Sequence, residues 1–133
     1  MLIYQGVDIV EIPKLRRLIQ RNERLVASVF SASEQEYCLS HDNRFQHLAG
    51  RLAAKEACLK ALGLGLSVTG IDTGLLEIEI VNLPSGRPEL HLSGWVSKVC
   101  DRKGICQQTV SISHAREYAV ATVVMLGAAA ASP

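Results

Sequence analysis

The chain has 133 residues, of which 48% are hydrophobic and 20% charged, and its formal net charge at pH 7 is +1. This length suits one compact domain, and the composition is typical of a folded protein and excludes a disordered one. Four cysteines without metal-type spacing argue against a structural zinc site, and the small net charge gives no reason to expect nucleic acid as a partner. The sequence shows no leader and no apolar run of membrane length, so we expect a cytoplasmic protein with no membrane partner.

The N-terminal segment, residues 2 to 10, is enriched in Val, Ile and Tyr and predicts a β-strand. Its one charged residue, Asp8, lies in the near-apolar run GVDIV. A carboxylate inside a buried strand is costly unless it is paired or binds a metal, so Asp8 is a candidate for one of these roles. Gly6, two residues earlier, suits a bulge or a close approach of another backbone.

A helix is expected from Pro13 onward, because the first turn of a helix tolerates the missing N–H of proline. Its predicted inner face consists of Ile12, Leu15, Leu18 and Ile19. Basic residues recur every three or four positions on the outside and form a stripe of Lys14, Arg17, Arg21 and Arg24. Such a stripe is either an ordinary solvated surface or a docking surface for an acidic partner. A capping box, Ser33-x-x-Glu36, predicts the start of a further short helix.

The central segment, residues 48 to 66, predicts a helix with one apolar stripe and a neighbouring face of small residues. The stripe is Leu48, Leu52, Leu59 and Leu62, and the neighbouring face is Ala49, Ala53, Glu56, Lys60 and Gly63. We expect a bulky group against the small residues. Gly63 is placed to end the helix, and Gly65 lets the following loop approach a ligand through its backbone.

Glu56 and Lys60 stand one helical turn apart, in the order that favours an ordinary ion pair on a helix surface. The alternative is that Glu56 joins Asp8 from the first strand. Together with Lys60, these two carboxylates form a site for a hard cation beside a phosphate-binding lysine.

The C-terminal half predicts two strand pairs and one helix. After a turn-rich stretch at 67–74, strands are expected at 76–81, 89–92, 106–114 and 117–126, with a hairpin loop at Ser85-Gly86-Arg87-Pro88 and a short helix opened by Ser93. Because regular βαβ alternation is missing, we predict an α+β fold: a small mixed or antiparallel sheet packed with a long central helix and shorter helices. Residues 1–126 form the one expected domain, and residues 127–133 a frayed tail.

Five segments, in this order and over nearly the whole chain, resemble the motifs of one enzyme family: GVDIVEIPKL, FSASEQEYC, LAGRLAAKEACLKALGLGL, SGRPEL and VSISHAREYAVATVVM. The family is that of the bacterial holo-acyl-carrier-protein synthases, the short branch of the 4'-phosphopantetheinyl transferase superfamily. The resemblance implies transfer of 4'-phosphopantetheine from coenzyme A to a serine of an apo acyl carrier protein, in fatty acid or polyketide synthesis. Adenosine 3',5'-bisphosphate is the expected second product.

The same resemblance implies that Mg²⁺ bridges the pyrophosphate of coenzyme A and is held by Asp8 and Glu56. Lys60 is expected to contact a pyrophosphate oxygen. Glu56 is also expected to take the serine proton, either directly or through a metal-bound water. The longer branch of the superfamily carries a second carboxylate two residues after the first, whereas this chain has Val10 there, so a water is expected at that metal position.

Further site residues follow from the resemblance. Gly86, Arg87 and Pro88 form a loop near the nucleotide end of coenzyme A, His114 lies against the bound coenzyme, and Gly63 and Gly65 contribute to the coenzyme-binding glycine loop. Lys55 either serves the nucleotide or forms a structural pair, and Glu34 has a structural role. The basic stripe docks the acyl carrier protein, and the active enzyme is a homotrimer with its sites at subunit interfaces.

Two alternatives belong to other classes of protein. One is a binding module that recognises carrier proteins or coenzyme A without turnover. In the other, Asp8 and Glu56 merely satisfy buried basic groups. The enzyme is favoured over both alternatives because the chain contains Asp8, Glu56, Lys60 and the glycine loop together.

Overall fold

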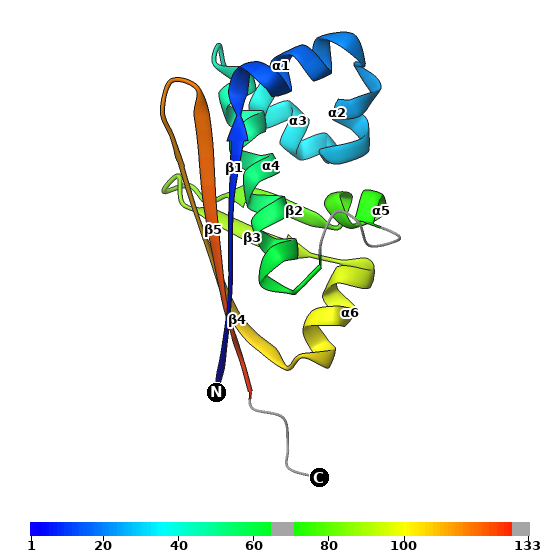
Figure 1. The fold of residues 1–133 in the computed structure, drawn as a ribbon, viewed down its shortest axis with the longest axis vertical. Coiled ribbons are helices and arrows are strands. Elements are labelled where there is room, and N and C mark those ends of the chain that lie inside the picture. Colours follow the sequence, from blue (N-terminus) through cyan, green and yellow to red (C-terminus); the bar gives the residue numbers. More distant parts are fainter. Residues whose placement is uncertain (65–70, 129–133) are drawn as a thin grey trace.

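The computed structural model of the chain describes residues 1–64 and 71–128. Its elements follow one another as β1 (Leu2–Glu11), α1 (Ile12–Arg21), α2 (Arg24–Val29), α3 (Ala32–Leu39), α4 (Arg44–Ala61), α5 (Ile71–Leu76), β2 (Ile78–Asn82), β3 (Pro88–Leu92), α6 (Gly94–Arg102), β4 (Ile105–His114) and β5 (Tyr118–Gly127). The helices lie to one side of the three long strands (Figure 1). The predicted α+β fold is confirmed.

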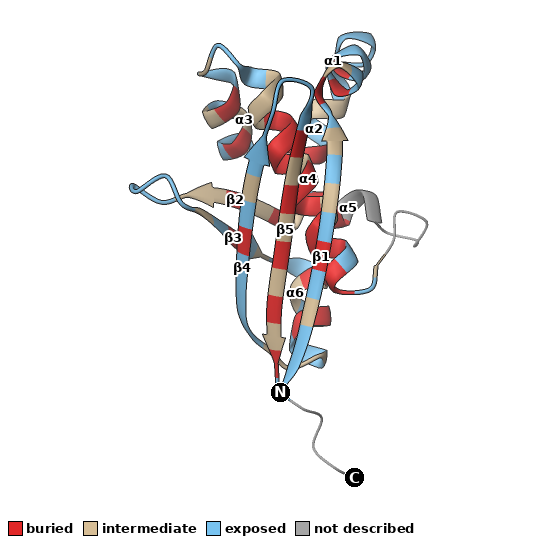
Figure 2. Ribbon diagram, turned by 60° about the vertical axis from the view of Figure 1, so that its left-hand side comes forward, coloured by how far each residue is buried: buried red, intermediate tan, exposed pale blue. Residues whose placement is uncertain are grey.

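The strands of the described residues form two antiparallel sheets. One has three strands in the order β1-β5-β4, and the other is the hairpin of β2 and β3. Because β5 lies between β1 and β4, Asp8 and Ile112 both pair with Ala121, from opposite sides. The outer face of the three-stranded sheet, which Figure 2 turns toward the viewer, is covered by no described element.

The central helix α4 packs against the inner face of this sheet and forms the middle of the core. Of its predicted apolar stripe, Leu48 and Leu59 are buried, as is Leu62 directly after the helix, while Leu52 is half-buried. Ala49 and Ala53 are fully buried. The bulky group expected against this part of the small-residue face is therefore the protein itself.

Two predictions about the N-terminal helices require correction. The first helix ends at Arg21 and α2 begins at Arg24, so the predicted basic stripe is divided between two helices. The capping box of α3 is formed by Ser31 and Glu34 and not by the predicted pair two residues later, Ser33 and Glu36. The pairs Ser31–Glu34 and Ser33–Glu36 have the same spacing, so the sequence pattern does not distinguish them. The structure does, because the chain is extended at Ser31 and helical from Ala32.

The C-terminal half has the predicted strands and the helix after Ser93 with shifted boundaries, but it also contains the helix α5, which was not predicted. Leu76 ends α5 and does not begin a strand, because β2 starts at Ile78. Gly127 still belongs to β5, whereas residues 129–133 of the expected tail lie outside the described residues, as does most of the turn-rich stretch. No helix within residues 1–64 and 71–128 is both long and apolar enough to cross a membrane.

Candidate active site

A glycine brings the first strand and the central helix into direct contact. A Cβ atom at Gly6 would lie 1.9 Å from the carbonyl oxygen of Ala57 and 2.6 Å from the amide nitrogen of Ala61. Only a residue without a side chain fits there, so the predicted close approach at Gly6 is confirmed. Asp8 lies two residues further along β1 and therefore directs its side chain to the same face, toward α4.

Lys60 on α4 forms an ion pair with Asp8 on β1. Its Nζ lies 2.8 Å from Asp8 Oδ1 and also donates a hydrogen bond of 3.2 Å to the carbonyl oxygen of Val7. The side chain of Asp8 is 11% exposed and that of Lys60 55% exposed, so the pair lies at the edge of the packed region. Among the ion pairs of the described residues none joins Glu56 to Lys60, and the ordinary surface pair favoured by their spacing is not formed.

The carboxyl group of Glu56 lies beside that of Asp8. Burial raises the pKa of Glu56 to about 8, with a further contribution from the neighbouring Asp8 and an opposing one from Lys60. Asp8 Oδ2 is buried and has no hydrogen-bond partner among the described residues. Two adjacent carboxylates in a partly buried place repel each other unless one is protonated or a cation lies between them.

This donor set fits a hard divalent cation, which prefers carboxylate oxygens. No group of three His, Cys, Asp or Glu side chains in residues 1–64 and 71–128 is arranged to hold a metal. Asp8 and Glu56 are therefore two candidate ligands without a third beside them in this part of the chain. A cation that keeps several of its own waters, as Mg²⁺ does, needs no more protein ligands than these.

A cavity of about 410 Å³ adjoins Glu56. Its wall includes Glu56 and Leu52 of α4, Lys14 and Leu18 of α1, Glu11 of β1 and Tyr118 of β5. Leu18 is 46% exposed, so its predicted place on the inner face of α1 was wrong. It contributes an apolar wall to this cavity instead. The cavity can therefore accept a ligand with both an apolar and a charged part.

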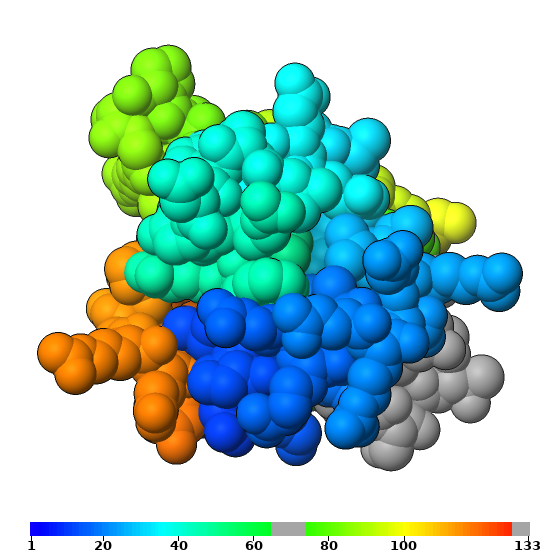
Figure 3. Space-filling view, turned by 90° about the horizontal axis from the view of Figure 1, so that it is seen from above, coloured from blue at the N-terminus to red at the C-terminus, as the bar shows by residue number. Residues whose placement is uncertain are grey.

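The basic residues lie around the end of the molecule that carries this cavity. Lys14, Arg17 and Arg21 are exposed on α1, and Arg24 is exposed at the start of α2. In the view of Figure 3, α1 and α2 cover this end beside the start of α4 and the β4–β5 turn. Lys14 connects the two features, since it belongs to the basic stripe and to the cavity wall.

A second cavity, of about 160 Å³, lies between the β2–β3 hairpin, the first turns of α4 and the end of β4. Its wall includes Gln46, Arg51, Asn82, Gly86, Pro88 and His114. Gln46 hydrogen-bonds Nδ1 of His114. His114, Gly86 and Pro88 therefore lie around one cavity. Arg87 lines a different cavity on the far side of the hairpin, together with Gln108 and Val124.

Arg51 is a site residue that the sequence reasoning missed. It is 5% exposed, its Nη2 donates to Asn82 Oδ1 at 2.5 Å, and its guanidinium lies 4.3 Å from the ring centroid of Tyr37. Its Nε has no partner among the described residues, and none of their ion pairs includes it. A buried guanidinium without a carboxylate is suited to bind an anionic ligand. The sequence feature that could have indicated Arg51 is its position one helical turn before Lys55, among residues that are otherwise small or apolar.

Lys55 takes the second of its two predicted roles, the structural pair. The side chain has no exposed surface, and its Nζ donates to Glu34 Oε1 at 2.7 Å and to the carbonyl oxygens of Leu75 and Ile78 at 2.8 and 2.7 Å. Its three donors are thus used within the protein, so its assignment to coenzyme A binding was wrong. Burial lowers the pKa of Lys55, and the Glu34 carboxylate opposes that effect.

The glycines after α4 are only partly described. Gly63 has a positive φ of 75° directly after the C-cap residue Leu62, which agrees with its predicted role in ending the helix. Gly65 lies outside the described residues.

A family model described as the 4'-phosphopantetheinyl transferase superfamily matches residues 5–123. The chain belongs to this superfamily. The resemblance based on the five sequence motifs is therefore confirmed.

Relatives of this chain are named holo-[acyl-carrier-protein] synthases. That of Chloroflexus aurantiacus is 44% identical over 133 residues, covering 92% of this chain and 97% of the relative, and that of Gloeobacter violaceus is 43% identical, covering 92% and 91%. An "ACPS-CoA complex" from Chronobacterium ammoniagenes matches with a TM-score of 0.85 and 32% identity, covering 97% of this chain and 100% of that one. The synthase of Helicobacter pylori in complex with coenzyme A matches with a TM-score of 0.78 and 32% identity, covering 92% and 99%.

Within the chain, the two groups of candidate site residues are separated. Asp8 lies on β1 and His114 ends β4, and these strands are the opposite edges of the three-stranded sheet. The cavity beside Glu56 and the cavity beside His114 share no lining residue. The carboxylates and the histidine therefore belong to two different cavities of the chain.

Proposed function

We propose that the protein transfers the 4'-phosphopantetheine group of coenzyme A to a serine hydroxyl of an apo acyl carrier protein. The serine oxygen bonds to the β-phosphorus, the bond from that phosphorus to the bridging oxygen breaks, and adenosine 3',5'-bisphosphate leaves. The observation that carries the proposal is the juxtaposition of Asp8, Glu56 and Lys60 beside a cavity, in a member of this superfamily.

The proposal includes Mg²⁺ as the cofactor, with Asp8 and Glu56 as its protein ligands. The fit rests on the unsatisfied Asp8 Oδ2 and on the raised pKa of Glu56, since a cation would stabilise both carboxylates in their charged form. When bound, Mg²⁺ would neutralise charge on the pyrophosphate of coenzyme A. Val10 supplies no oxygen ligand, so waters complete the coordination.

The chain's own groups perform the remaining tasks. Lys60, more than half exposed, can turn its ammonium from Asp8 toward a pyrophosphate oxygen and stabilise the charge of the leaving group. Glu56, which lines the cavity and lies beside Asp8, accepts the serine proton, directly or through a water.

The second cavity is proposed to hold the nucleotide end of coenzyme A. That end is rich in phosphate, and the cavity wall contains the buried guanidinium of Arg51 and the imidazole of His114. Gly86 and Pro88 form its rim. Arg87 belongs to this proposal only if its side chain turns from the cavity that it lines on the far side of the hairpin.

Docking of the carrier protein is proposed at the basic end of the molecule. Acyl carrier proteins are acidic helical domains, and Lys14, Arg17, Arg21 and Arg24 present the opposite charge around the first cavity. A serine presented there reaches Glu56 through the same opening. We also propose a cytoplasmic location and a role in fatty acid synthesis, where such carriers are used.

A homotrimer with shared sites is proposed as the active assembly. The outer face of β1 exposes Ile3, Val7 and Ile9, of which each is more than half accessible, and these side chains alternate with those that face α4. Burial of this face against other subunits would remove apolar surface from water and could bring His114 of one subunit toward Asp8 of another. This arrangement accounts for the separation of the two cavities within one chain.

The test is incubation of the protein with coenzyme A, magnesium and an apo acyl carrier protein, followed by mass spectrometry of the carrier. The expected result is a mass increase by one phosphopantetheine, which disappears when magnesium is chelated. A carrier that binds without any change in mass would identify a binding module. If the protein binds neither the carrier nor coenzyme A, the carboxylates of Asp8 and Glu56 have only a structural role.

A further inference from the structure

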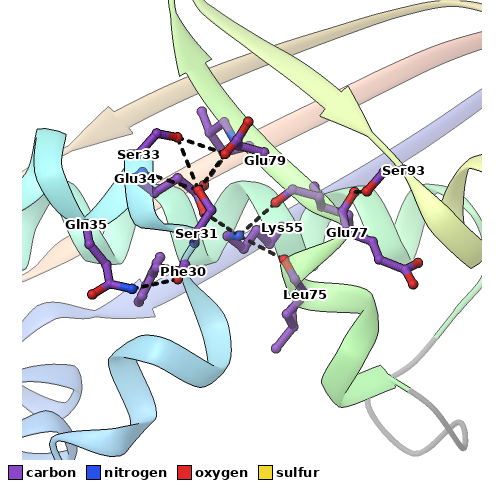
Figure 4. A network of polar contacts seen from close by, with 12 residues as sticks. Phe30, Ser31, Ser33, Glu34, Gln35, Lys55, Leu75, Glu77, Glu79 and Ser93 are labelled. Carbon is purple, nitrogen blue, oxygen red and sulfur yellow. Dashed lines mark hydrogen bonds and ion pairs between the residues drawn. The ribbon is translucent and has the colours of Figure 1, made fainter.

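Two buried side chains form hydrogen bonds with backbone groups on the edge of β2 that does not face β3. Ile78 and Ile80 direct backbone groups away from the partner strand β3, toward side chains of α3 and α4. The Ile78 carbonyl oxygen accepts from Lys55 Nζ at 2.7 Å, and the Ile80 N–H donates to Glu34 Oε2 at 2.9 Å. Figure 4 shows Glu34 and Lys55 within this network. The two side chains thus take the place of a neighbouring strand.

The same two side chains bind each other without exposure to solvent. Glu34 Oε1 accepts from Lys55 Nζ at 2.7 Å and from the Ser31 N–H at 2.9 Å, and both side chains are 0% exposed. A buried ion pair is not by itself a source of stability, because its desolvation costs as much as its attraction returns. Here every donor of Lys55 has a directed partner on another element, which specifies one position of β2 relative to α4.

The next contact between β2 and α4 belongs to the second cavity. Asn82 lies two residues beyond Ile80, and Arg51 lies one helical turn before Lys55. Ile80, which Glu34 holds, is thus about 7 Å from Asn82 along the strand, and Lys55 is about 6 Å from Arg51 along the helix. Both members of the buried pair therefore act close to the contact between Arg51 and Asn82. Arg51 donates to Asn82 at 2.5 Å, and Asn82 Nδ2 donates to the Gly86 carbonyl oxygen at 3.0 Å.

We infer that Glu34 and Lys55 are positioning residues for the binding of coenzyme A. They set the position of β2 against α4, and this places Arg51, Asn82 and Gly86 around the cavity for the nucleotide end. The inference rests on the function proposed above. Glu56 adjoins Lys55 in the sequence but lines the other cavity, against β1, so its contribution to the chemical step does not depend on the position of the hairpin.

The inference is tested with the double variant Glu34→Leu/Lys55→Met, in which apolar side chains of similar size leave no buried charge unpaired. With saturating carrier protein, the KM for coenzyme A should rise by about tenfold to a hundredfold while kcat changes little, because the ground-state contacts are displaced and the carboxylates are not. The Kd for adenosine 3',5'-bisphosphate should rise by a similar factor. The amide of Ile80 should exchange its hydrogen faster, since it loses its acceptor.

The matched control is Gln35→Leu on the same helix. Gln35 Nε2 donates to the carbonyl oxygen of Phe30 at 2.9 Å, a bond of similar kind without any link to β2. The KM of the Gln35→Leu variant for coenzyme A should equal that of the wild type, even if the melting temperature of the variant is lower. A double variant whose KM and Kd are unchanged would overturn the positioning role and leave the pair purely structural.

If the double variant does not fold, Glu34→Gln takes its place, since it retains the side-chain shape and loses one of its acceptors. It should raise the KM for coenzyme A in the same direction, and an unchanged KM overturns the inference. A wild type that neither binds adenosine 3',5'-bisphosphate nor modifies a carrier rejects the proposed function itself. An active wild type with unaffected variants rejects the positioning role alone.

Discussion

Lys60 Nζ lies 2.8 Å from Asp8 Oδ1, so the ammonium group of α4 is paired with the strand β1 and not with Glu56 of its own helix. Glu56 consequently keeps a carboxyl group that is partly buried, lies beside another carboxyl group and has its pKa raised to about 8. Because Lys60 pairs with Asp8 and not with Glu56, the carboxyl groups of Glu56 and Asp8 lie side by side, an arrangement that suits a cation.

Glu56→Gln should lower the transferase activity by at least about tenfold to a hundredfold, because the variant keeps the shape of the side chain and removes one carboxylate from the proposed magnesium site. The measurement is the initial rate of carrier modification as a function of magnesium concentration. The circular dichroism spectrum should remain that of the wild type. Normal turnover at low magnesium would reject the metal assignment.

In the absence of magnesium, the difference in stability between the wild type and Glu56→Gln should depend on pH. The folded pKa of Glu56, about 8, exceeds its ordinary value of 4.5, so the folded state binds more protons between these values. The wild type should therefore lose stability relative to the variant as pH rises from 4.5 to 8, and the difference should level off above that. Urea unfolding at several pH values measures it, and parallel curves for the two proteins would contradict the raised pKa.

Arg17→Glu/Arg21→Glu should raise the KM for the carrier protein by about tenfold and leave the KM for coenzyme A unchanged. The two arginines are exposed on α1, and a long-range attraction to an acidic partner is lost when their charge is reversed. Binding of carrier to the wild type should also weaken with added salt.

The matched control for this charge reversal is Lys98→Glu/Arg102→Glu on α6, which changes the net charge equally on a helix distant from the first cavity. Its KM for the carrier should stay close to that of the wild type. Equal effects of both double variants would indicate an influence of net charge alone and return the stripe to an ordinary solvated surface.

Asp8→Ala and His114→Ala, each inactive alone, should recover activity when they are unfolded and refolded together. If the sites lie between subunits, some interfaces in mixed trimers combine an intact Asp8 with an intact His114. Each variant refolded by itself provides the background rate. Light scattering measures the assembly independently, and a monomeric active protein would reject the trimer.

Gly6→Ala should destabilise the protein by at least about 3 kcal/mol, because the added Cβ would overlap the backbone of α4. Gly63→Ala is the comparison, since its Cβ would meet no atom within 4 Å and only the positive φ is unfavourable, at about 1 kcal/mol. Chemical denaturation measures both. Equal losses would show that β1 and α4 can separate without much cost.

The sequence alone determined most of the elements and the family, although it did not predict the short helices α2 and α5. Periodic leucines in α4, the hairpin punctuated by Gly86 and Pro88, and alternation in β4 all reflect local geometry that neighbouring residues impose on one another. Asp8 was recognisable as a candidate because a charge in an apolar strand is costly wherever the strand lies. Five motifs in order sufficed to identify the superfamily.

Other features depended on contacts between residues distant in the chain, and only the tertiary structure decided them. Lys55 and Lys60 occupy the same helix with the same charge, yet one pairs with Glu34 in the core and the other with Asp8 at the edge of a cavity. Arg51 acquires its role because β2 brings Asn82 to it from 31 residues away. Burial and the identity of the nearest opposite charge fix these roles, and both are properties of the packed chain that local sequence does not contain.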